Sequence, residues 1–256
     1  MAKPIAKKSK IFEIFKRTVM SPSEVVTSAL QETIDEKPTP EVIKKNFSGL
    51  IEKLQKEAYS TYLEAQTKSG QAALKEYYRT AIADVDSKEK AIETVVGSFD
   101  ELDRFFLSLS QSRKARAGSA FEDVIRTLFK MLYYPFDEQI IINGKPDFLM
   151  PGEKHYRSNP MDCLIFTAKR TLRERWRQIV TEGTRGLGFF LATIDDQVTE
   201  TQLKEMKNNR IYLVVPSSMK TTIPHYKKAV NVLTFESFFQ DHLDPAVQRW
   251  TRAKII

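Results

Sequence analysis

The chain has 256 residues, enough for one large domain or two small ones, and it carries a net charge of +7 with 29% charged residues. Its single cysteine, Cys163, excludes a disulfide framework and favours a reducing, cytoplasmic location. No apolar run approaches the roughly 20 residues that span a bilayer, so a membrane span is excluded, and the basic balance is compatible with a polyanionic partner.

The first part of the chain predicts helices only. Residues 11–15 suit a short amphipathic helix. Ser21-Pro22-Ser23-Glu24 combines a serine cap, a proline at the first helical position and an acid in the first turn, which predicts a helix to about residue 35. Pro38-Thr39-Pro40 ends this predicted helix. Apolar residues at intervals of three and four then predict a long helix up to Gly70.

Two further helices are expected, over residues 71–85 and 88–110, and Gly97-Ser98 marks a break within the second. Since no strand pattern appears up to this point, we predict an all-helical N-terminal region, residues 1–104, that serves dimerisation or DNA contact. The remainder, residues 105–256, is predicted to form a separate domain.

The pattern changes after these helices. Arg113 to Gly118 predicts a basic turn, and residues 119–133 predict an amphipathic helix. Two strands, residues 138–142 and 145–150, are expected to form a hairpin, because Asn143-Gly144 suits a tight type I′ turn.

Strands and helices then alternate to the end of the chain. After a polar loop, the expected strands are residues 162–166, 186–194, 210–215 and 230–233, and the expected helices begin near residues 171, 198 and 234. This alternation predicts an α/β domain with a mixed central sheet flanked by helices.

Two charged side chains lie where neighbouring strands are expected to end. Asp147 belongs to the second hairpin strand, and Lys169 follows the next strand, so the two can meet at adjacent strand ends. An acid and a lysine so placed suit metal-dependent phosphodiester hydrolysis. The acid holds Mg²⁺, the carbonyl oxygen of Ala168 adds a ligand, and the lysine stabilises the attacking water or the developing charge. The competing interpretation is a Pro-Asp turn and an unrelated surface lysine.

Chemistry of this type usually has a second acid two residues before the lysine, where this chain has Thr167. We expect Glu182 to replace it, roughly three and a half turns along the helix that follows Lys169. Glu122, on the preceding helix, is a further candidate acid near the metal.

Three stretches, Ser112 to Gly118, Pro146-Asp147-Phe148 and Phe166 to Gln178, resemble in the same order the EcoRII, SsoII and PspGI family of Type II restriction endonucleases. The resemblance covers roughly residues 105 to 250 and implies a restriction-endonuclease-like PD-(D/E)xK core that uses Mg²⁺. It assigns catalysis to three residues: Asp147, Lys169 and Glu182. It also implies cleavage of palindromic or near-palindromic CCNGG or CCWGG sites before the first C, leaving 5′ overhangs.

The same resemblance places the chain closer to the SsoII and PspGI branch, because the EcoRII branch carries a separate N-terminal effector domain built largely of strands. Arg173-Glu174-Arg175 resembles the element that reads the G·C pairs. The chemistry agrees: arginine donates two hydrogen bonds to guanine O6 and N7, and glutamate accepts one from cytosine N4. Without the resemblance to this family, the commoner explanation of such a charged triplet is a helix face exposed to solvent. Five cations are expected at backbone phosphates: Arg113, Lys114, Arg116, Arg170 and Arg177.

We therefore expect a homodimer, or a higher oligomer, on double-stranded DNA, since a two-fold site suits a two-fold protein. A cognate DNA methyltransferase would belong to the same system without direct contact. Relatives flip both central bases into pockets, for which the helical region offers five side chains without a clear assignment: Tyr59, Tyr62, Tyr77, Tyr78 and Arg79. The alternatives are a DNA-repair nuclease on the same core and a non-catalytic sequence-specific DNA-binding protein.

Overall fold

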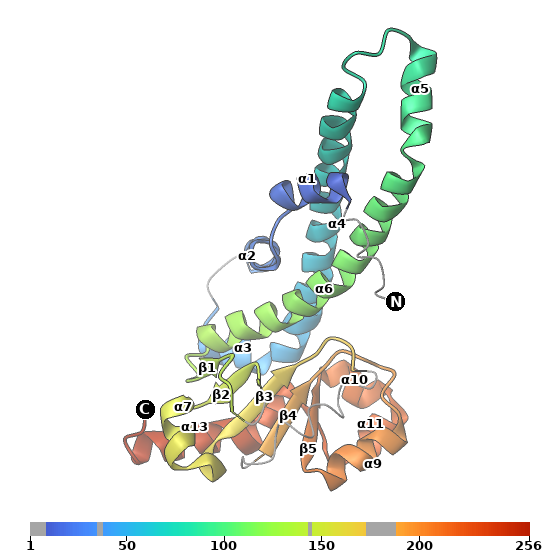
Figure 1. Cartoon of the computed structure of the whole chain (residues 1–256). Helices are drawn as coiled ribbons and strands as arrows, with labels where there is room; N and C mark the ends of the chain where they lie inside the picture. The colour runs from blue at the N-terminus through green and yellow to red at the C-terminus, as the bar shows by residue number, and fades with distance from the viewer. Residues whose placement is uncertain (1–8, 35–37, 143–144, 173–187) are drawn as a thin grey trace, which may run out of the picture. The chain divides into compact units, whose positions relative to one another are not determined.

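The structure is a computed structural model that describes residues 9–34, 38–142, 145–172 and 188–256 (Figure 1). The chain forms two compact units. Unit 1 comprises Met1–Ala29 and Glu57–Ala120, and unit 2 comprises Leu30–Lys56 and Phe121–Ile256. The boundary that we placed between residues 104 and 105 stays a prediction. Within the described residues, no helix is both long and apolar enough to cross a bilayer.

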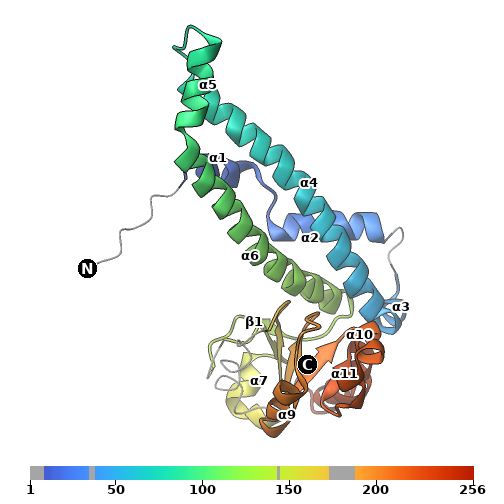
Figure 2. The same ribbon diagram turned by 90° about the vertical axis from the view of Figure 1, so that its right-hand side faces the viewer.

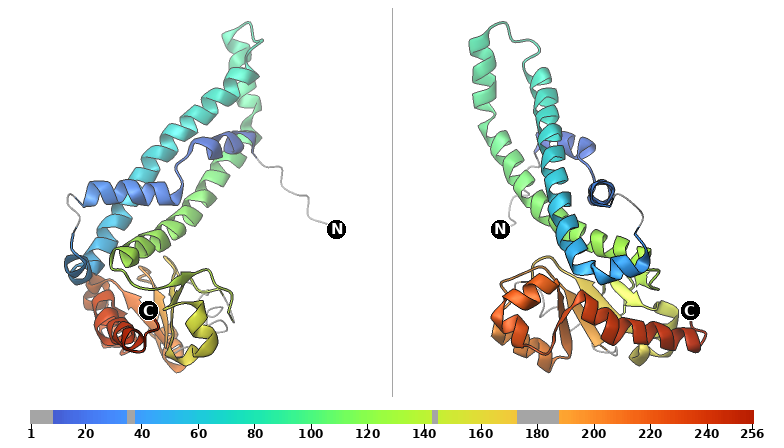
Figure 3. Two further views of the ribbon diagram at one scale, coloured as in Figure 1. Left: turned by 90° about the vertical axis from the view of Figure 1, so that its left-hand side faces the viewer. Right: turned by 180° about the vertical axis from the view of Figure 1, so that it is seen from behind.

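Unit 1 is entirely helical in its described part. Its helices are α1 (Lys10–Thr18), most of α2 (Pro22–Thr33), the later part of α4 (Phe47–Ala81), α5 (Lys88–Gly97) and the first part of α6 (Phe99–Met131). Here α4 and α6 lie alongside each other (Figures 2 and 3). Ser9 caps α1 and donates a 2.7 Å hydrogen bond to Glu101 on α6, while Phe15 packs edge-on against Phe105 with ring centroids 6.3 Å apart. The helical N-terminal region is thus confirmed.

Two details of these helices differ from the sequence-based expectation. Helix α4 does not end at Gly70, because this glycine is buried beneath the Phe105 ring, where α4 packs on α6. The basic turn expected over residues 113–118 is wrong, since α6 runs through it to Met131. Arginine, lysine and alanine are good helix formers, and one internal glycine costs only about 1 kcal/mol. The break at Gly97-Ser98 is confirmed.

Unit 2 contains a six-stranded mixed sheet in the order β1-β2-β3-β4-β5-β6. The strands are β1 (Asp137–Glu138), β2 (Phe148–Met150), β3 (Leu164–Ala168), β4 (Gly188–Ala192), β5 (Ile211–Val215) and β6 (Val232–Thr234). The β1–β2 and β2–β3 pairs are antiparallel, and β3 to β6 are parallel to one another. The predicted mixed α/β fold is confirmed.

Unit 2 also contains helices. They are α3 (Pro40–Lys45), α7 (Glu153–Ser158), η1 (Pro160–Asp162), α9 (Glu200–Asn208), α10 (Ser217–Thr222), α11 (Pro224–Lys228), α12 (Phe235–Phe238), η2 (Phe239–Leu243) and α13 (Asp244–Arg252), together with the unit 2 parts of α2, α4 and α6. In Figure 1, α7 lies on the β1–β2 side of the sheet and α9, α10 and α11 lie on the β5 side.

Alternate side chains of a strand point to opposite faces of the sheet. In the central strands the side chains on both faces are buried. On one face, Ile165 and Leu191 belong to a buried cluster that includes Leu203 and Met206 of α9. On the other face, Phe166 packs 5.2 Å from the Phe129 ring of α6 and 5.1 Å from the Phe238 ring of α12. Each such buried side chain contributes roughly 1.5–3 kcal/mol, so the strand ends that carry the charged residues are held in place.

The predicted bounds of the two hairpin strands are wrong. β1 is limited to Asp137–Glu138, which pair with Leu149 and Phe148, so residues 139–142 and 145–147 lie outside the paired strands. Ile140 and Ile142 leave the ladder and pack against the buried cluster on the α9 face, while Pro146 has no N–H to donate. The expected polar loop after β2 instead contains α7, and the Asn143-Gly144 turn and most of the helix expected after residue 171 lie outside the described residues.

Candidate active site

Asp147 and Lys169 lie side by side. Asp147 immediately precedes β2, Lys169 immediately follows β3, and the antiparallel pairing of Phe148 with Phe166 brings these two strand ends together. The Lys169 Nζ atom lies 2.8 Å from Oδ2 and 3.1 Å from Oδ1 of Asp147. Two residues that were proposed from sequence spacing therefore share one edge of the sheet; their catalytic roles stay predictions.

The Asp147 carboxylate is held by the backbone of β3. Its side chain is only 6% exposed, and the Ala168 N–H donates a 2.8 Å hydrogen bond to Oδ2. Thr167, at the position where an acid is usual, accepts a 3.4 Å hydrogen bond from the Asp147 N–H through Oγ1. The Lys169 N–H continues the ladder to the Ala192 carbonyl at 2.9 Å. Hydrogen bonds therefore fix the backbone positions of both Asp147 and Lys169.

Glu122, on the unit 2 part of α6, lies within electrostatic range of this pair. Burial and the negative charge of Asp147 raise the pKa of Glu122, and Arg126 and Lys169 only partly offset this effect. The Arg126 guanidinium donates to Glu122 Oε1 at 2.6 Å. The structure therefore brings Glu122 together with Asp147 and Lys169, as the sequence suggested.

These residues fit a divalent cation. Two nearby carboxylates repel each other, and Mg²⁺ is commonly bound by one or two carboxylates together with waters and substrate phosphate oxygens. Over the described part of the chain, no group of three or more histidine, cysteine, aspartate or glutamate side chains could hold a metal. Glu182, the third predicted acid, lies outside that part. The donor set suits Mg²⁺ shared with a phosphate better than an all-protein cage.

Sequence analysis missed two residues at the same edge, Thr193 and Asp195. The Asp195 carboxylate accepts from the Leu172 N–H at 2.7 Å, and Thr193 Oγ1 donates to the Arg170 carbonyl at 3.2 Å. These two hydrogen bonds connect the segment that follows β3 to the segment that follows β4. The signal was available, because parallel strands bring the residues after their carboxyl ends to one edge of a sheet.

The remaining predicted site residues are only partly described. Five of them lie outside the described residues: Arg173, Glu174, Arg175, Arg177 and Glu182. In unit 1, Arg113 donates to Gln66 at 2.9 Å, and Arg116 donates to the Met20 carbonyl and lies 5.5 Å from the Tyr62 ring centroid. Arg113 and Lys114 are exposed, whereas Arg116 is half-buried.

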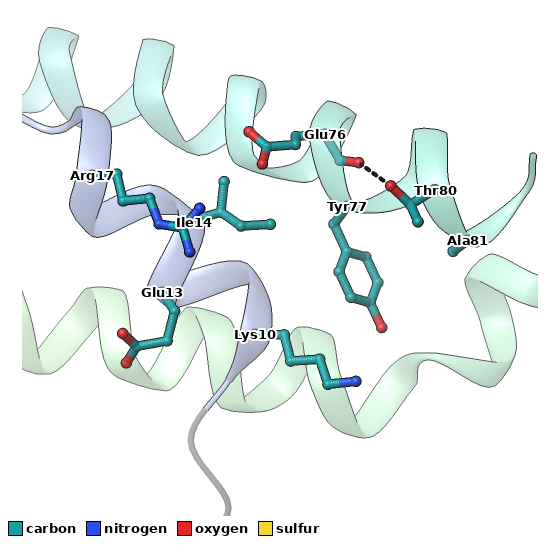
Figure 4. A pocket seen from close by; sticks show the side chains of 8 residues that line it. All are labelled: Lys10, Glu13, Ile14, Arg17, Glu76, Tyr77, Thr80 and Ala81. Carbon is teal, nitrogen blue, oxygen red and sulfur yellow. Dashed lines mark hydrogen bonds between the residues drawn. The ribbon is translucent and has the colours of Figure 1, made fainter.

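The candidate side chains for a flipped-base pocket differ in their surroundings. Tyr62 is buried, whereas Tyr59 is 47% exposed. Tyr77 lines a pocket of about 570 Å³ between α1 and α4, together with Lys10 and Arg17 (Figure 4). The assignment of a base to any of these side chains stays open.

Replacing Glu122 with glutamine is expected to stabilise the metal-free protein near neutral pH. The pKa of Glu122 is raised in the folded state, so its ionised form opposes folding above that pKa. The penalty vanishes below about pH 4, where the carboxyl is protonated in both the folded and the unfolded state. Thermal unfolding with a chelator should therefore give a higher Tm for Glu122→Gln near neutral pH and an equal Tm in acid.

Glu200→Gln is the matched control. A hydrogen bond from Lys204 lowers the pKa of Glu200, so this substitution should leave Tm unchanged or reduce it. A lower Tm of Glu122→Gln near neutral pH would contradict the crowding of negative charge at this site.

Comparisons with known proteins agree with this geometry. Residues 77–239 match the family model described as EcoRII C terminal. The Type II restriction enzyme SsoII of Shigella sonnei is 34% identical over 150 residues, which cover 54% of this chain and 48% of SsoII. The Type II restriction enzyme EcoRII of Escherichia coli is 34% identical over 151 residues, covering 57% of this chain and 37% of EcoRII. The matched part thus spans less than half the length of either curated relative.

Solved structures extend the similarity over more of the chain. Metal-depleted Ecl18kI in complex with uncleaved DNA has a TM-score of 0.80 and 27% identity, covering 94% of this chain and 83% of that chain. The PspGI–substrate DNA complex has a TM-score of 0.63 and covers 97% of this chain and 98% of that chain. At 20% identity, the second match supports the fold alone.

Proposed function

Because the chain belongs to the EcoRII C-terminal family, whose members SsoII and EcoRII are Type II restriction enzymes, we propose that it is a Type II restriction endonuclease. It hydrolyses double-stranded DNA at a CCNGG or CCWGG site before the first C, leaving 5′ overhangs, and it requires Mg²⁺. The observation that carries this proposal is the contact between the Asp147 carboxylate and the Lys169 ammonium at adjacent strand ends.

The side chains divide the chemistry between them. Asp147 and Glu182, with the carbonyl oxygen of Ala168, would hold the cation, and Glu122 would add negative charge beside them. When bound, the ion would act as a Lewis acid and lower the pKa of a coordinated water. Lys169 holds its positive charge where the attacking water and the scissile phosphate meet, which stabilises the negative charge that builds up during attack. Burial of Asp147 limits competition from bulk water.

Sequence recognition falls to the segment that follows β3. Arg173 and Arg175 donate to guanines and Glu174 accepts from a cytosine in the major groove. Phosphate contacts come from Arg113, Lys114, Arg116, Arg170 and Arg177. The central base pair is flipped out of the duplex, with its bases stacked on aromatic or guanidinium groups of the helical region.

The working protein is a homodimer, because a two-fold site presents one scissile phosphate on each strand. A methyltransferase that protects the host site accompanies the enzyme without binding it. The single cysteine, Cys163, is buried, and burial raises its pKa to about 12, which suits an unreactive thiol in a reducing cytoplasm.

Digestion of a plasmid of known sequence tests the proposal. With Mg²⁺, the ends should map to every CCNGG or CCWGG site and carry 5′ overhangs, and a chelator should stop cleavage. A matched plasmid without such sites should stay intact. Cutting without sequence preference would favour a repair nuclease, and tight site-specific binding without any cutting would favour a non-catalytic DNA-binding protein.

A further inference from the structure

We propose that Arg126 is a positioning residue that fixes the Glu122 carboxylate relative to Asp147, so that the two carboxylates act on one divalent cation. The inference rests on the proposed function, because it needs a metal-dependent site at Asp147. It concerns a residue of α6 that the catalytic set does not include.

One guanidinium contacts three carboxylates from two elements. Arg126 donates through Nη2 to Glu122 at 2.6 Å, through Nη1 to Asp123, and through Nε to Glu138 of β1. The Arg126 side chain is 21% exposed, so these contacts are partly shielded from water. A planar guanidinium offers several donors in a fixed geometry, which allows it to orient one carboxylate while anchored on another.

Glu138, the β1 residue that Arg126 contacts, lies close to Asp147 through the pairing of β1 with β2. Glu138 pairs with Phe148 across the β1–β2 ladder, and Phe148 is the next residue after Asp147. The guanidinium also lies 6.0 Å from the centroid of the Phe148 ring. In Figure 1 the end of α6 lies beside β1 and β2, consistent with these contacts. Arg126 therefore connects the helix that carries Glu122 to the strand that follows Asp147.

The local charge balance explains why a cation is needed there. The four carboxylates of Glu122, Asp123, Glu138 and Asp147 contribute −4, and Arg126 and Lys169 contribute +2, which leaves −2 when all six groups are ionised. This remainder equals the charge that one divalent cation neutralises. Without Arg126 the excess would be −3, and Glu122 could turn away from Asp147, since like charges that are close together repel each other.

The test measures Mn²⁺ binding to the DNA-free protein by electron paramagnetic resonance of free Mn²⁺, alongside thermal unfolding. Arg126→Gln should weaken Mn²⁺ binding by about 10- to 100-fold, the usual effect of losing a residue that orients a ligand. Arg126→Lys should lose less, because the charge remains. Glu138→Gln keeps the arginine and loosens only its anchor, so it should also weaken binding. The control Arg157→Gln, which removes an exposed ion pair with Glu153, should leave binding unchanged.

The outcomes separate the two proposals. If wild-type protein binds Mn²⁺ and cuts DNA while folded Arg126→Gln binds Mn²⁺ within two-fold of wild type, the inference is overturned and Arg126 is structural only. If Arg126→Gln does not fold, Arg126→Lys and Glu138→Gln decide in the same way. If wild-type protein neither binds Mn²⁺ nor cuts DNA, the proposed function itself fails.

Discussion

Replacing Asp147 with asparagine is expected to abolish DNA cleavage while leaving the fold and site-specific binding in Ca²⁺ largely intact. Asparagine keeps an oxygen that can accept from the Ala168 N–H, and the Lys169 side chain is 31% exposed, so its charge can be solvated by water. What is lost is the charged metal ligand, worth several kcal/mol, and each 1.4 kcal/mol is a factor of ten in rate. Cleavage should therefore fall at least about 10³-fold in a single-turnover assay.

Asp196→Asn provides the control for this substitution. Asp196 is an exposed acid in the loop after β4, where it accepts a hydrogen bond from the neighbouring Gln197 side chain. Its replacement should leave the cleavage rate unchanged. Normal cleavage by Asp147→Asn would refute the catalytic assignment, and loss of folding would show that Asp147 is needed for structure; Asp147→Ala would then serve as a second variant.

The second large effect is expected at the residues assigned to base recognition. Arg175→Ala and Glu174→Ala should each weaken binding to the cognate site far more than binding to unrelated DNA. Each bidentate base contact is worth about 1–3 kcal/mol, and a homodimer loses it in both half-sites, so the cognate affinity should fall by about 2–6 kcal/mol. That change corresponds to roughly 30- to 10⁴-fold in Kd.

Arg177→Ala distinguishes base contacts from phosphate contacts. A phosphate contact should weaken cognate and non-cognate binding about equally and, because the homodimer loses it twice, should reduce the salt dependence of binding by about two units of slope. Competition assays with cognate and scrambled duplexes at several salt concentrations measure both quantities. Equal losses on the two duplexes for Arg175→Ala and Glu174→Ala would contradict direct reading of G·C pairs.

The sequence predicted the sheet better than its connections. β3, β4 and β5 are apolar runs buried on both faces, so composition alone locates them. The strand expected over residues 138–142 is shorter than predicted, because Ile140 and Ile142 pack against the buried cluster instead of pairing with β2. The basic segment of α6 is helical because arginine, lysine and alanine are good helix formers and one glycine does not offset them.

Some residues of the candidate site were likewise identified from the sequence, and others were not. Asp147, Lys169 and Glu122 were identified because charged residues near strand ends and on a core-facing helix are few. Arg126, Thr193 and Asp195 were not identified, although parallel strand ends pointed to the last two, because each has a contact to another element: Arg126 reaches Glu138 of β1, Thr193 reaches the Arg170 carbonyl, and Asp195 reaches the Leu172 N–H. Such contacts depend on how elements pack, and a single sequence does not encode them locally.

The hydrogen bonds between the segments that follow β3 and β4 have a consequence for where the DNA is cut. The Lys169 N–H is bound to Ala192 and the Leu172 N–H to Asp195, only three residues further along. On the proposed function, this short tether sets the offset between the broken phosphodiester and the bases that are read. Inserting one residue between positions 169 and 172 should therefore move the cleavage point along the strand, while the preferred sequence stays the same.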